Sequence, residues 1–544
     1  MSVIRLRLSH FANEKRITLA LSLQVRLMAW WKILLIGLAV IASLGATALF
    51  YVVYVMEPDI YVPLYVENCG HCHGGDLEGT SNGLALVGGP LNGGDNVVAL
   101  QQSIKYKHPE LGTPAFSEVL SDIEIKGLSI FVGERRLGQR FSDFRFDREV
   151  NMPAQTLSSE EHDFLIETVI DGLSPLIFSI EPLSNGSFLV TEKERGLSFV
   201  SAEGVQSDLI EGTPLTGGSI DLMGVQYGSG WLLDVATHPE YEENGWVYLH
   251  YTDICGEPCG EGLMEASMNR LDRGHIVDGR WTDVETIWQA PLAFYSATPD
   301  TGAGGRIAFD DQGHVYLSVG IKPAETLDTT PQNLNSPYGK IHRVGDDGSV
   351  PLDNPFLMGA KEFVRQTIWT YGHRSPQGLE WNPVRRTVWN SEMGPRGGDE
   401  LNELLPGRNY GWPYFSLGLE YAGVVVERHK ANSVEFEAEQ VEQTLVDITP
   451  SPAISSFAFY SGDRFPGWQD NVLIGSLKGS SLFRMVFDGT ELLHRETLIK
   501  DLARIRDVEI GYDGLVYLLL ENEAGSSIVK LKPQDGRVAM QEEL

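Results

Sequence analysis

Two cysteines and a histidine near the start of the chain form its most distinctive chemical pattern. Cys69 and Cys72 are separated by two residues, and His73 follows directly. At this spacing each thiol can add to one vinyl group of a porphyrin while the imidazole reaches the iron. A zinc site would need a second Cys or His pair nearby, and a redox dithiol would need a thioredoxin-like βαβ context. The sequence therefore predicts covalently attached haem c with His73 as the proximal iron ligand.

A hydrophobic stretch precedes this motif. Residues 33–56 are uncharged, and as a helix they would be roughly 36 Å long, enough to span a bilayer. Residues 1–56 hold six basic side chains against one acidic, which predicts a single-pass anchor in a bacterial inner membrane, with a cytoplasmic N-terminus and a periplasmic remainder. A signal peptide cleaved near Ala46-Thr47-Ala48 is the alternative, but the apolar run is long for one. Met28 is an alternative start.

Length, charge and cysteine count narrow the class of protein. At 544 residues the chain should hold more than one domain. Its net charge of −32 excludes nucleic acid as an expected partner. The other two cysteines, Cys255 and Cys259, flank a short predicted loop. Outside the cytoplasm a disulfide between them is favoured, and two free thiols are the alternative.

The pattern of apolar residues divides the chain. Residues 57–135 are predicted to form a small all-α domain, and the charged, irregular stretch 136–158 a linker. From residue 159 to about 535, short apolar runs recur around Asn-Gly and Asp-Gly turns without long helices between them. This pattern of short apolar runs and tight turns is typical of a mainly β fold. Because the region is too long for one β-sandwich, we expect a β-propeller. Residues 536–544 are a C-terminal tail.

Motifs in the propeller region resemble those of a known enzyme family. They occur in the family order at 231–239, 304–307, 339–341, 371–379, 392–400 and 407–413. The densest are Tyr-Gly-His-Arg-Ser-Pro-Gln-Gly-Leu at 371–379 and Glu-Met-Gly-Pro-Arg-Gly-Gly-Asp-Glu at 392–400. From about residue 160 to 535 the chain resembles soluble glucose/aldose sugar dehydrogenases, which hold pyrroloquinoline quinone (PQQ) and Ca²⁺ on a six-bladed propeller. Residues 60–135 resemble small class I cytochromes c.

The resemblance implies a cofactor cage and a metal site. PQQ carries three carboxylates and an o-quinone, and arginines bind carboxylates in a bidentate manner. A lysine beside the quinone can stabilise charge that develops as hydride arrives, a catalytic role that falls to Lys478. Main-chain carbonyls match the ligands of the catalytic Ca²⁺, an ion that prefers hard oxygen ligands. The matching positions are Arg374, Lys478, Arg504 and Arg506 for PQQ, and Gly394 and Pro395 for Ca²⁺.

The substrate side departs from the family pattern. The family's general base is a histidine four residues before the arginine that matches Arg306, and here that position is Gly302. Asp300 is the nearest replacement for a base that must take the hydroxyl proton. The family's early glutamine falls near Ser229, and the asparagine after the cage arginine is Ser375. The cofactor cage is therefore kept while the substrate side is altered.

The haem region departs as well. Thr113 stands where similar cytochromes have the distal methionine ligand. His108 and Met152 are the two replacements in the sequence, and five-coordinate iron is the third alternative. Two imidazole ligands would lower the haem potential relative to a His/Met pair.

Together these features predict a membrane-anchored quinohaemoprotein. It would oxidise an aldose-type sugar or a related alcohol through PQQ and pass electrons through its haem to a respiratory acceptor, a cytochrome or the quinone pool. The alternative is a non-catalytic haem-linked propeller that acts as a binding or sensor module, which the missing histidine favours.

Overall fold

The computed structural model describes residues 59–106, 115–138, 144–222, 225–255, 265–322, 329–431 and 434–534. By its internal packing the chain divides into two units, residues 1–64 and 65–544, and the second holds the haem motif and the propeller. The predicted anchor, residues 33–56, lies outside the described residues. Within the described ranges, no helix has the length and apolar character needed to cross a bilayer.

Helices form the N-terminal part of the described chain. They are α2 (Tyr61–Asn68), α3 (Gly70–His73), α4 (Val97–Lys105) and α5 (Asp122–Arg136). We call residues 65–138 the helical segment. Helix α5 begins with a capping box in which the Ser121 side chain accepts from the Glu124 amide and the Glu124 carboxylate accepts from the Ser121 amide. Its buried face includes Phe131, whose ring lies 5.5 Å from that of Tyr65.

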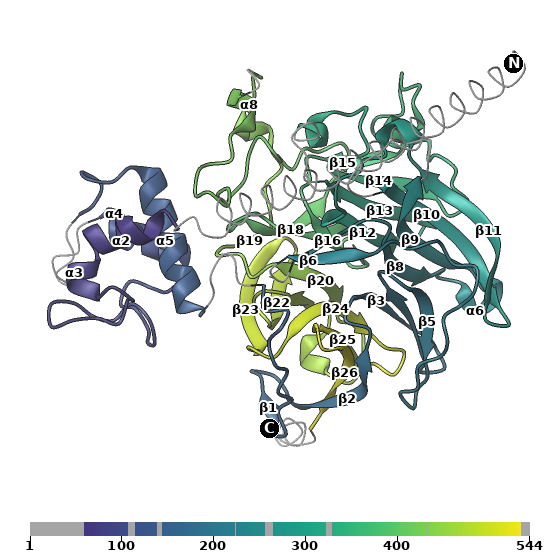
Figure 1. The fold of residues 1–544 in the computed structure, drawn as a ribbon, viewed down its shortest axis with the longest axis horizontal. Coiled ribbons are helices and arrows are strands. Elements are labelled where there is room, and N and C mark those ends of the chain that lie inside the picture. The colour runs from purple at the N-terminus through teal and green to yellow at the C-terminus, as the bar shows by residue number, and fades with distance from the viewer. Residues whose placement is uncertain are drawn as a thin grey trace, which may run out of the picture. The chain divides into compact units, whose positions relative to one another are not determined.

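Six antiparallel sheets follow in chain order and form the blades of a propeller (Figure 1). The innermost strands β3, β8, β12, β16, β20 and β24 contact one another in cyclic order. The ring closes where β2, the strand that follows the linker, pairs with β26 at the end of the propeller. This confirms the predicted six-bladed β-propeller.

The blades have the following bounds: β3–β5, Ile177–Pro182, Phe188–Glu192 and Gly196–Val200; β8–β11, Leu232–Thr237, Val247–Cys255, Ala266–Val277 and Arg280–Gln289; β12–β15, Gly302–Phe309, His314–Ile321, Lys340–Gly345 and Ile368–Tyr371; β16–β19, Pro376–Asn382, Thr387–Glu392, Asp399–Leu404 and Val446–Ile448; β20–β23, Ile454–Phe459, Val472–Ser476, Leu482–Asp488 and Glu491–Ile499; β24–β26, Arg504–Ile510, Val516–Glu521 and Ser526–Pro533, extended by β2 (Asp163–Leu173) and β1 (Leu157–Ser158).

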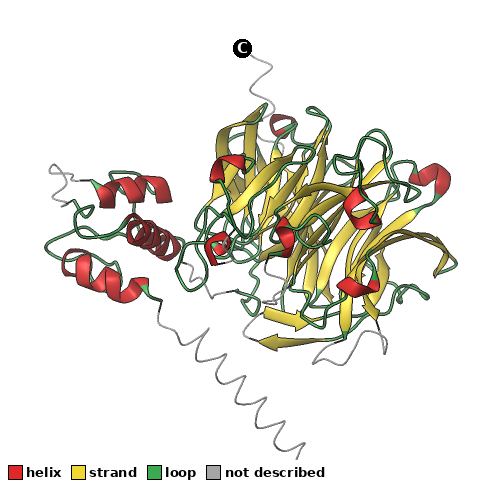
Figure 2. Cartoon of the chain, turned by 90° about the horizontal axis from the view of Figure 1, so that it is seen from above, coloured by secondary structure: helices red, strands yellow, loops and turns green. Residues whose placement is uncertain are grey.

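Shorter elements connect these strands (Figure 2). A separate hairpin consists of β6 (Ser219–Leu222) and β7 (Val225–Gly228). The described helices of the propeller are all short: α6 (Tyr241–Asn244), α7 (Phe363–Thr367), α8 (Arg428–Ala431), η3 (Leu292–Phe294), η5 (Thr330–Gln332), η6 (Ala438–Gln440) and η7 (Pro466–Trp468).

Local sequence explains the blades. At the β3–β4 and β24–β25 turns, Gly186 and Gly514 have φ of +82° and +76°, the left-handed conformation that the predicted Asn-Gly and Asp-Gly turns require. The strands between such turns are apolar on both faces because each blade is covered by its neighbours. For example, Phe164, Phe465 and Trp468 pack edge to face or stacked within one buried cluster.

A buried ion pair joins helix α5 to the propeller loop between β17 and β18. Glu134 Oε2 lies 2.9 Å from Arg396 Nη2, and Oε1 accepts from Arg396 Nε at 3.2 Å. Both side chains are almost fully buried, at 3% and 0% exposed. The adjacent Gly133 has no room for a side chain, because a Cβ would lie 2.9 Å from the Pro450 ring. Helix α5 is therefore closely packed on the propeller.

Removing the carboxylate of Glu134 should strongly weaken this contact. Glu134→Ala would remove the carboxylate that pairs with the buried Arg396, and breaking a buried ion pair typically costs about 3–5 kcal/mol. We expect a clear fall in the thermal midpoint at which helix α5 separates from the propeller, measured by scanning calorimetry. Lys105→Ala, which breaks an ion pair with the exposed Asp122, is the matched control and should leave the midpoint nearly unchanged. Equal midpoints for wild type and Glu134→Ala would contradict the described packing.

Candidate active site

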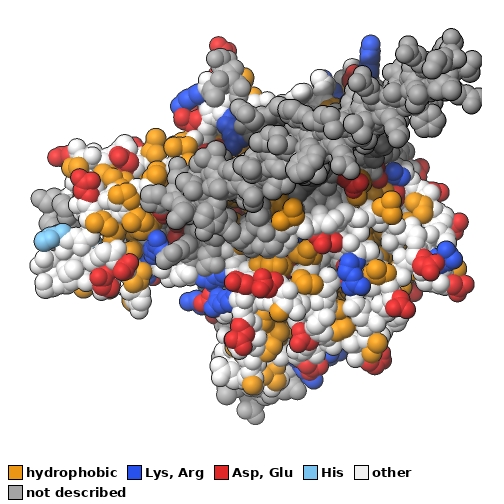
Figure 3. All heavy atoms as spheres, viewed as in Figure 1, with side chains coloured by type: hydrophobic (Ala, Val, Ile, Leu, Met, Phe, Trp, Pro, Cys, Tyr) orange, Lys and Arg blue, Asp and Glu red, His pale blue; other side chains and the backbone are white. Residues whose placement is uncertain are grey.

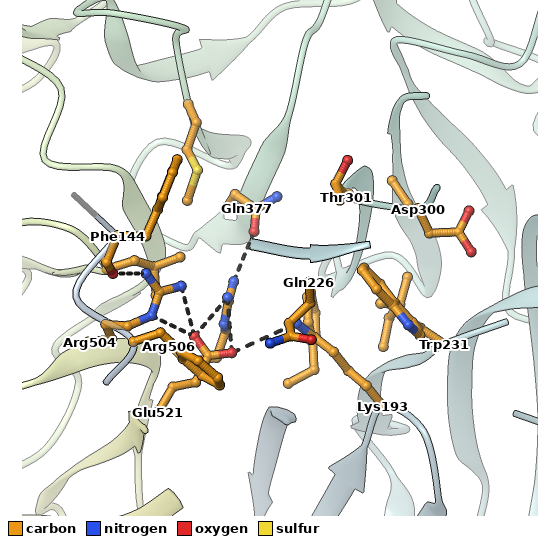
Figure 4. A pocket seen from close by; sticks show the side chains of 17 residues that line it. Phe144, Lys193, Gln226, Trp231, Asp300, Thr301, Gln377, Arg504, Arg506 and Glu521 are labelled. Carbon is orange, nitrogen blue, oxygen red and sulfur yellow. Dashed lines mark hydrogen bonds and ion pairs between the residues drawn. The ribbon is translucent and has the colours of Figure 1, made fainter. Parts of the chain in front are cut away.

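A cavity of about 130 Å³ lies where the innermost strands of several blades begin. Aromatic and apolar side chains form part of its wall, and charged and amide side chains the rest (Figure 4). The cavity lining includes Phe144, Phe146, Phe178, Lys193, Gln226, Trp231, Asp300, Gln377, Arg504, Arg506 and Glu521. They come from the linker, the β6–β7 hairpin and five blades, so the cavity exists only when the ring has closed.

Three cations and one carboxylate dominate one side of this cavity. Glu521 accepts from Arg504 and from Arg506, each at 3.0 Å, and lies 3.8 Å from Lys193 Nζ. Burial would raise the pKa of Glu521, but Arg506, Arg504 and Lys193 lower it to about 2. With Glu521 ionised, the group keeps a net positive charge in a chain whose net charge is −32. Such a site favours an anionic ligand.

Arg506 has a donor that the described protein does not satisfy. Its Nη1 donates to Gln377 Oε1 at 3.2 Å, but its Nε is buried without a hydrogen-bond partner among the described residues. Beneath it, Arg306 donates from Nη2 to the Arg506 carbonyl and from Nε to the Gln377 carbonyl, at 3.2 and 2.9 Å. These two hydrogen bonds from Arg306 hold the main chain of Arg506 and of Gln377 in place. A buried unpaired donor is costly, so this geometry suits an acceptor supplied by a ligand.

The structure brings only part of the predicted cage together in this cavity. Arg504 and Arg506 line it, side by side on β24. Arg374 donates to the carbonyl of Met393, a lining residue, at 3.1 Å, and its guanidinium lies over the Trp412 ring. Lys478 is buried and follows the lining residue Leu477. Arg374 and Lys478 therefore do not line the described cavity, but each adjoins a residue that does.

Asp300, the predicted general base, lines the cavity but is held by donors, which argues against that role. Its carboxylate lies 2.8 Å from Lys322 Nζ and accepts from Ser267 Oγ and from the Gly230 amide, both at 3.0 Å. Both members of the ion pair are buried, and in Figure 4 the carboxylate points away from the arginines. With its acceptor sites occupied by these donors, Asp300 has a structural role.

Gly302 could not simply be replaced by the family histidine. A Cβ at this position would lie 2.8 Å from the Ile321 carbonyl oxygen, a main-chain atom that cannot move aside easily. The backbone of β12 and β13 is therefore packed for glycine here. This chain therefore lacks the histidine side chain at this position and also has a backbone too close to accommodate one.

The loop predicted to bind Ca²⁺ is held by a buried carboxyl. Asp399 accepts from the Gly394 amide and from the Ile454 amide, each at 2.9 Å, and burial raises its pKa to about 6. In the described ranges no three His, Cys, Asp or Glu side chains are grouped as metal ligands. The Ca²⁺ prediction thus continues to rest on the main-chain carbonyls of Gly394 and Pro395.

The haem motif lies on and beside helix α3. His73 Nδ1 lies 2.7 Å from the Leu84 carbonyl oxygen; because a carbonyl only accepts, Nδ1 carries the proton and Nε2 keeps its lone pair. Neither Cys69 nor Cys72 forms a disulfide, and burial, with Cys72 adding to it, raises the pKa of the Cys69 thiol to about 11. A dithiol redox site needs the opposite shift.

His108 and Met152 are the two predicted candidates for the distal iron ligand. His108 lies outside the described residues. Met152 is partly buried against the hydrophobic cluster that contains Phe164 and Trp468, so its side chain packs on the propeller, which argues against its role as an iron ligand. Cys255 is disulfide-bonded, while Cys259 lies outside the described residues and their pairing stays a prediction.

Sequence reasoning missed Lys193 and Glu521. Lys193 follows strand β4 and Glu521 ends β25, and nothing in either local sequence distinguishes them from ordinary charged residues at strand ends. It also missed the linker residues Phe144 and Phe146. Only closure of the ring places these residues around Arg506.

Comparisons with known proteins fit this fold. The family model described as glucose/sorbosone dehydrogenase matches residues 174–530. Aldose sugar dehydrogenase YliI of Escherichia coli K12 is 33% identical over 316 residues, 57% of this chain and 79% of YliI. Quinoprotein glucose dehydrogenase B of Acinetobacter calcoaceticus is 26% identical over 381 residues, 57% of this chain and 76% of the relative. The apo crystal structure of the E. coli soluble aldose sugar dehydrogenase has a TM-score of 0.58 at 30% identity, covering 68% of this chain and 100% of that one.

The six-bladed propeller is the fold that this chain shares with the crystal structure of a soluble aldose sugar dehydrogenase. The chain belongs to the glucose/sorbosone dehydrogenase family. The characterised relatives are sugar dehydrogenases and therefore oxidoreductases.

Proposed function

We propose that this chain is a membrane-anchored quinohaemoprotein that oxidises an aldose-type sugar or a related alcohol with PQQ and Ca²⁺, and that its haem c passes the electrons to a respiratory acceptor. The observation that carries the proposal is the cationic cavity, with its unsatisfied Arg506 donor, in the fold of a sugar dehydrogenase family. Residues 1–56 would anchor the chain in a bacterial inner membrane, with the cytochrome-like and propeller parts in the periplasm.

The cavity residues fit PQQ. Arg504 and Arg506 would hold carboxylates of the cofactor, and the Arg506 Nε would gain the acceptor that it lacks. The Phe178 and Trp231 rings, with Lys193 Nζ at 5.5 and 5.0 Å from their centres, offer apolar walls for a flat ring system. When bound, PQQ accepts two electrons from the hydroxyl-bearing carbon of the substrate. Ca²⁺ would be held by the Gly394 and Pro395 carbonyls.

The helical segment fits a covalent haem. His73 Nδ1 donates to the Leu84 carbonyl, which orients the ring and leaves Nε2 for iron. Figure 3 shows hydrophobic side chains gathered on this segment, and Leu84 and Val119 are 70% and 71% exposed. A porphyrin would cover apolar surface that the polypeptide alone leaves to water. Cys69 and Cys72 would form the thioether bonds, with His108 as the distal candidate.

A second function has one specific observation in its favour. The backbone at Gly302 leaves no space for the family's base, and the nearby Asp300 is held in an ion pair. A haem-linked propeller that binds a ligand without oxidising it would need no base. This alternative predicts ligand binding without turnover.

Dye-linked turnover separates the two functions. The full chain, purified in detergent and supplied with PQQ and Ca²⁺, would be given an artificial electron acceptor and a panel of aldoses and simple alcohols. We expect acceptor reduction that requires PQQ. Demonstrated PQQ binding with no turnover on any member of the panel would instead support the non-catalytic propeller.

Lys193 should make PQQ binding depend on pH. Burial, and then repulsion from Arg506, lowers the pKa of Lys193 to about 7. An anionic ligand favours the charged lysine, so affinity should be greatest below pH 7 and fall as pH rises above it, by up to about tenfold per pH unit. Lys193→Arg keeps the charge and should remove this fall. Superimposable pH profiles of affinity for the two proteins would contradict the assignment.

A further inference from the structure

The linker before the propeller enters the candidate cofactor site. Residues 144–148, which we call the strap, run between the helical segment and strand β1. Phe144 and Phe146 both line the cavity, and Phe146 is 4% exposed. Phe144 lies beside Arg504 in Figure 4. Between them Arg145 has a φ of +55°, a left-handed conformation that a non-glycine residue adopts only when its surroundings hold it.

The strap is fixed to the propeller along its length. The Phe146 carbonyl accepts from the Glu523 amide at 3.0 Å, and the Arg148 carbonyl accepts from Asn522 Nδ2 at 2.6 Å. Arg145 and Arg148 both pair with Asp501, at 2.8 and 3.2 Å. The two strap carbonyls accept hydrogen bonds from Asn522 and Glu523, which directly follow Glu521 in the chain. The segment 521–523 therefore carries the Glu521 carboxylate and also holds the strap.

The strap also holds a cage arginine. Arg504 Nη1 donates to the Phe144 carbonyl, and its guanidinium lies 5.6 Å from the centre of the Phe146 ring. Arg504 also donates to Glu521, from Nε and from Nη2. Its orientation is thus set by the strap on one side and by Glu521 on the other. Phe146 and Gln226 also border a second cavity of about 300 Å³, so the Phe146 ring stands between the two.

We propose that the strap is part of the cofactor-binding site: Phe144 and Phe146 form a wall against a bound planar, polyanionic cofactor, and the Phe144 carbonyl holds Arg504 toward its carboxylate. This inference rests on the proposed function. It adds binding residues that lie outside the propeller, in the segment that connects it to the cytochrome-like part. Without the Phe146 ring the cofactor cavity would open into the second cavity, which would admit water beside the ligand.

The test measures cofactor affinity and not turnover. The full haem-loaded chain in detergent is titrated with PQQ in the presence of Ca²⁺, and free PQQ is measured after ultrafiltration. Replacing both rings, Phe144→Ala with Phe146→Ala, should raise the Kd about tenfold, since an aromatic wall and a cation–π contact are lost. Asp501→Asn loosens the strap without touching the cavity and should raise the Kd about two- to fivefold.

Two controls accompany these variants. Tyr512→Ala removes an exposed aromatic ring, and Asp311→Asn breaks an ion pair with Arg386 that lies outside the strap; neither should change the Kd. Unchanged or tighter binding in the double variant would overturn the inference. If that variant does not fold, an unchanged Kd in Asp501→Asn overturns it. A wild-type chain that binds no PQQ would overturn the proposed function itself, before any variant is compared.

Discussion

Arg506→Ala should weaken PQQ binding by about thirtyfold or more. Truncating one member of a buried, hydrogen-bonded charge pair typically costs about 2–5 kcal/mol, and Arg506 is buried between Glu521, Gln377 and the cavity. The variant would also remove the Nε donor that lacks a partner in the described protein. Of the two arginines that line the cavity, only Arg504, which pairs with Glu521, would then remain.

Equilibrium titration with PQQ and Ca²⁺ measures this loss, with the free cofactor quantified by absorbance. Arg506→Lys keeps the charge but loses the planar fork, so an intermediate loss is expected. Arg386→Ala, at an exposed ion pair with Asp311, is the control for removing a cation from an acidic protein. An Arg506→Ala chain that binds PQQ as tightly as the Arg386→Ala chain would show that the cofactor lies elsewhere.

Replacing both Cys69 and Cys72 with alanine should abolish covalent haem attachment. In the proposed haem site each thiol would supply one of the two thioether bonds, and no other described cysteine lies in the helical segment. We expect the haem-stained band on a denaturing gel to disappear, and electron delivery from sugar to an external cytochrome to fall to background. PQQ affinity should be unchanged, because neither cysteine lines the cavity.

A variant at His71 provides the matched control. His71 occupies a variable position of the Cys-x-x-Cys-His pattern, so His71→Ala should keep the covalent haem. Retention of a haem-stained band in the double cysteine variant would contradict the assignment of this motif. Loss of PQQ affinity in that variant would show that the helical segment and the propeller do not act as separate binding parts.

Sequence predicted the features whose signals are local. The Asn-Gly turn at Gly186 dictates a left-handed residue. The family resemblance grouped Arg504 and Arg506 in one cofactor cage, and both line the described cavity; their role toward PQQ stays a prediction. The order of family motifs also predicted the six-bladed ring.

The remaining site residues depend on tertiary contacts that no local pattern encodes. Asp300 looked like a base because it is close in sequence to Gly302, but its partner Lys322 comes from the end of the next strand and neutralises it. Lys193 meets Glu521 only because the last blade closes against the first. Phe146 reaches Arg504 because the linker folds onto the propeller; its charged, irregular sequence indicated only a connection.

The most direct test of the account follows the oxidation state of the haem. The full chain with oxidised haem would be mixed anaerobically with PQQ, Ca²⁺ and an aldose, and the haem absorbance recorded over time. We expect haem reduction that requires PQQ and the sugar together and that is lost in Arg506→Ala. Haem that stays oxidised with PQQ demonstrably bound, across aldoses and simple alcohols, would contradict the proposal that this chain is a quinohaemoprotein dehydrogenase.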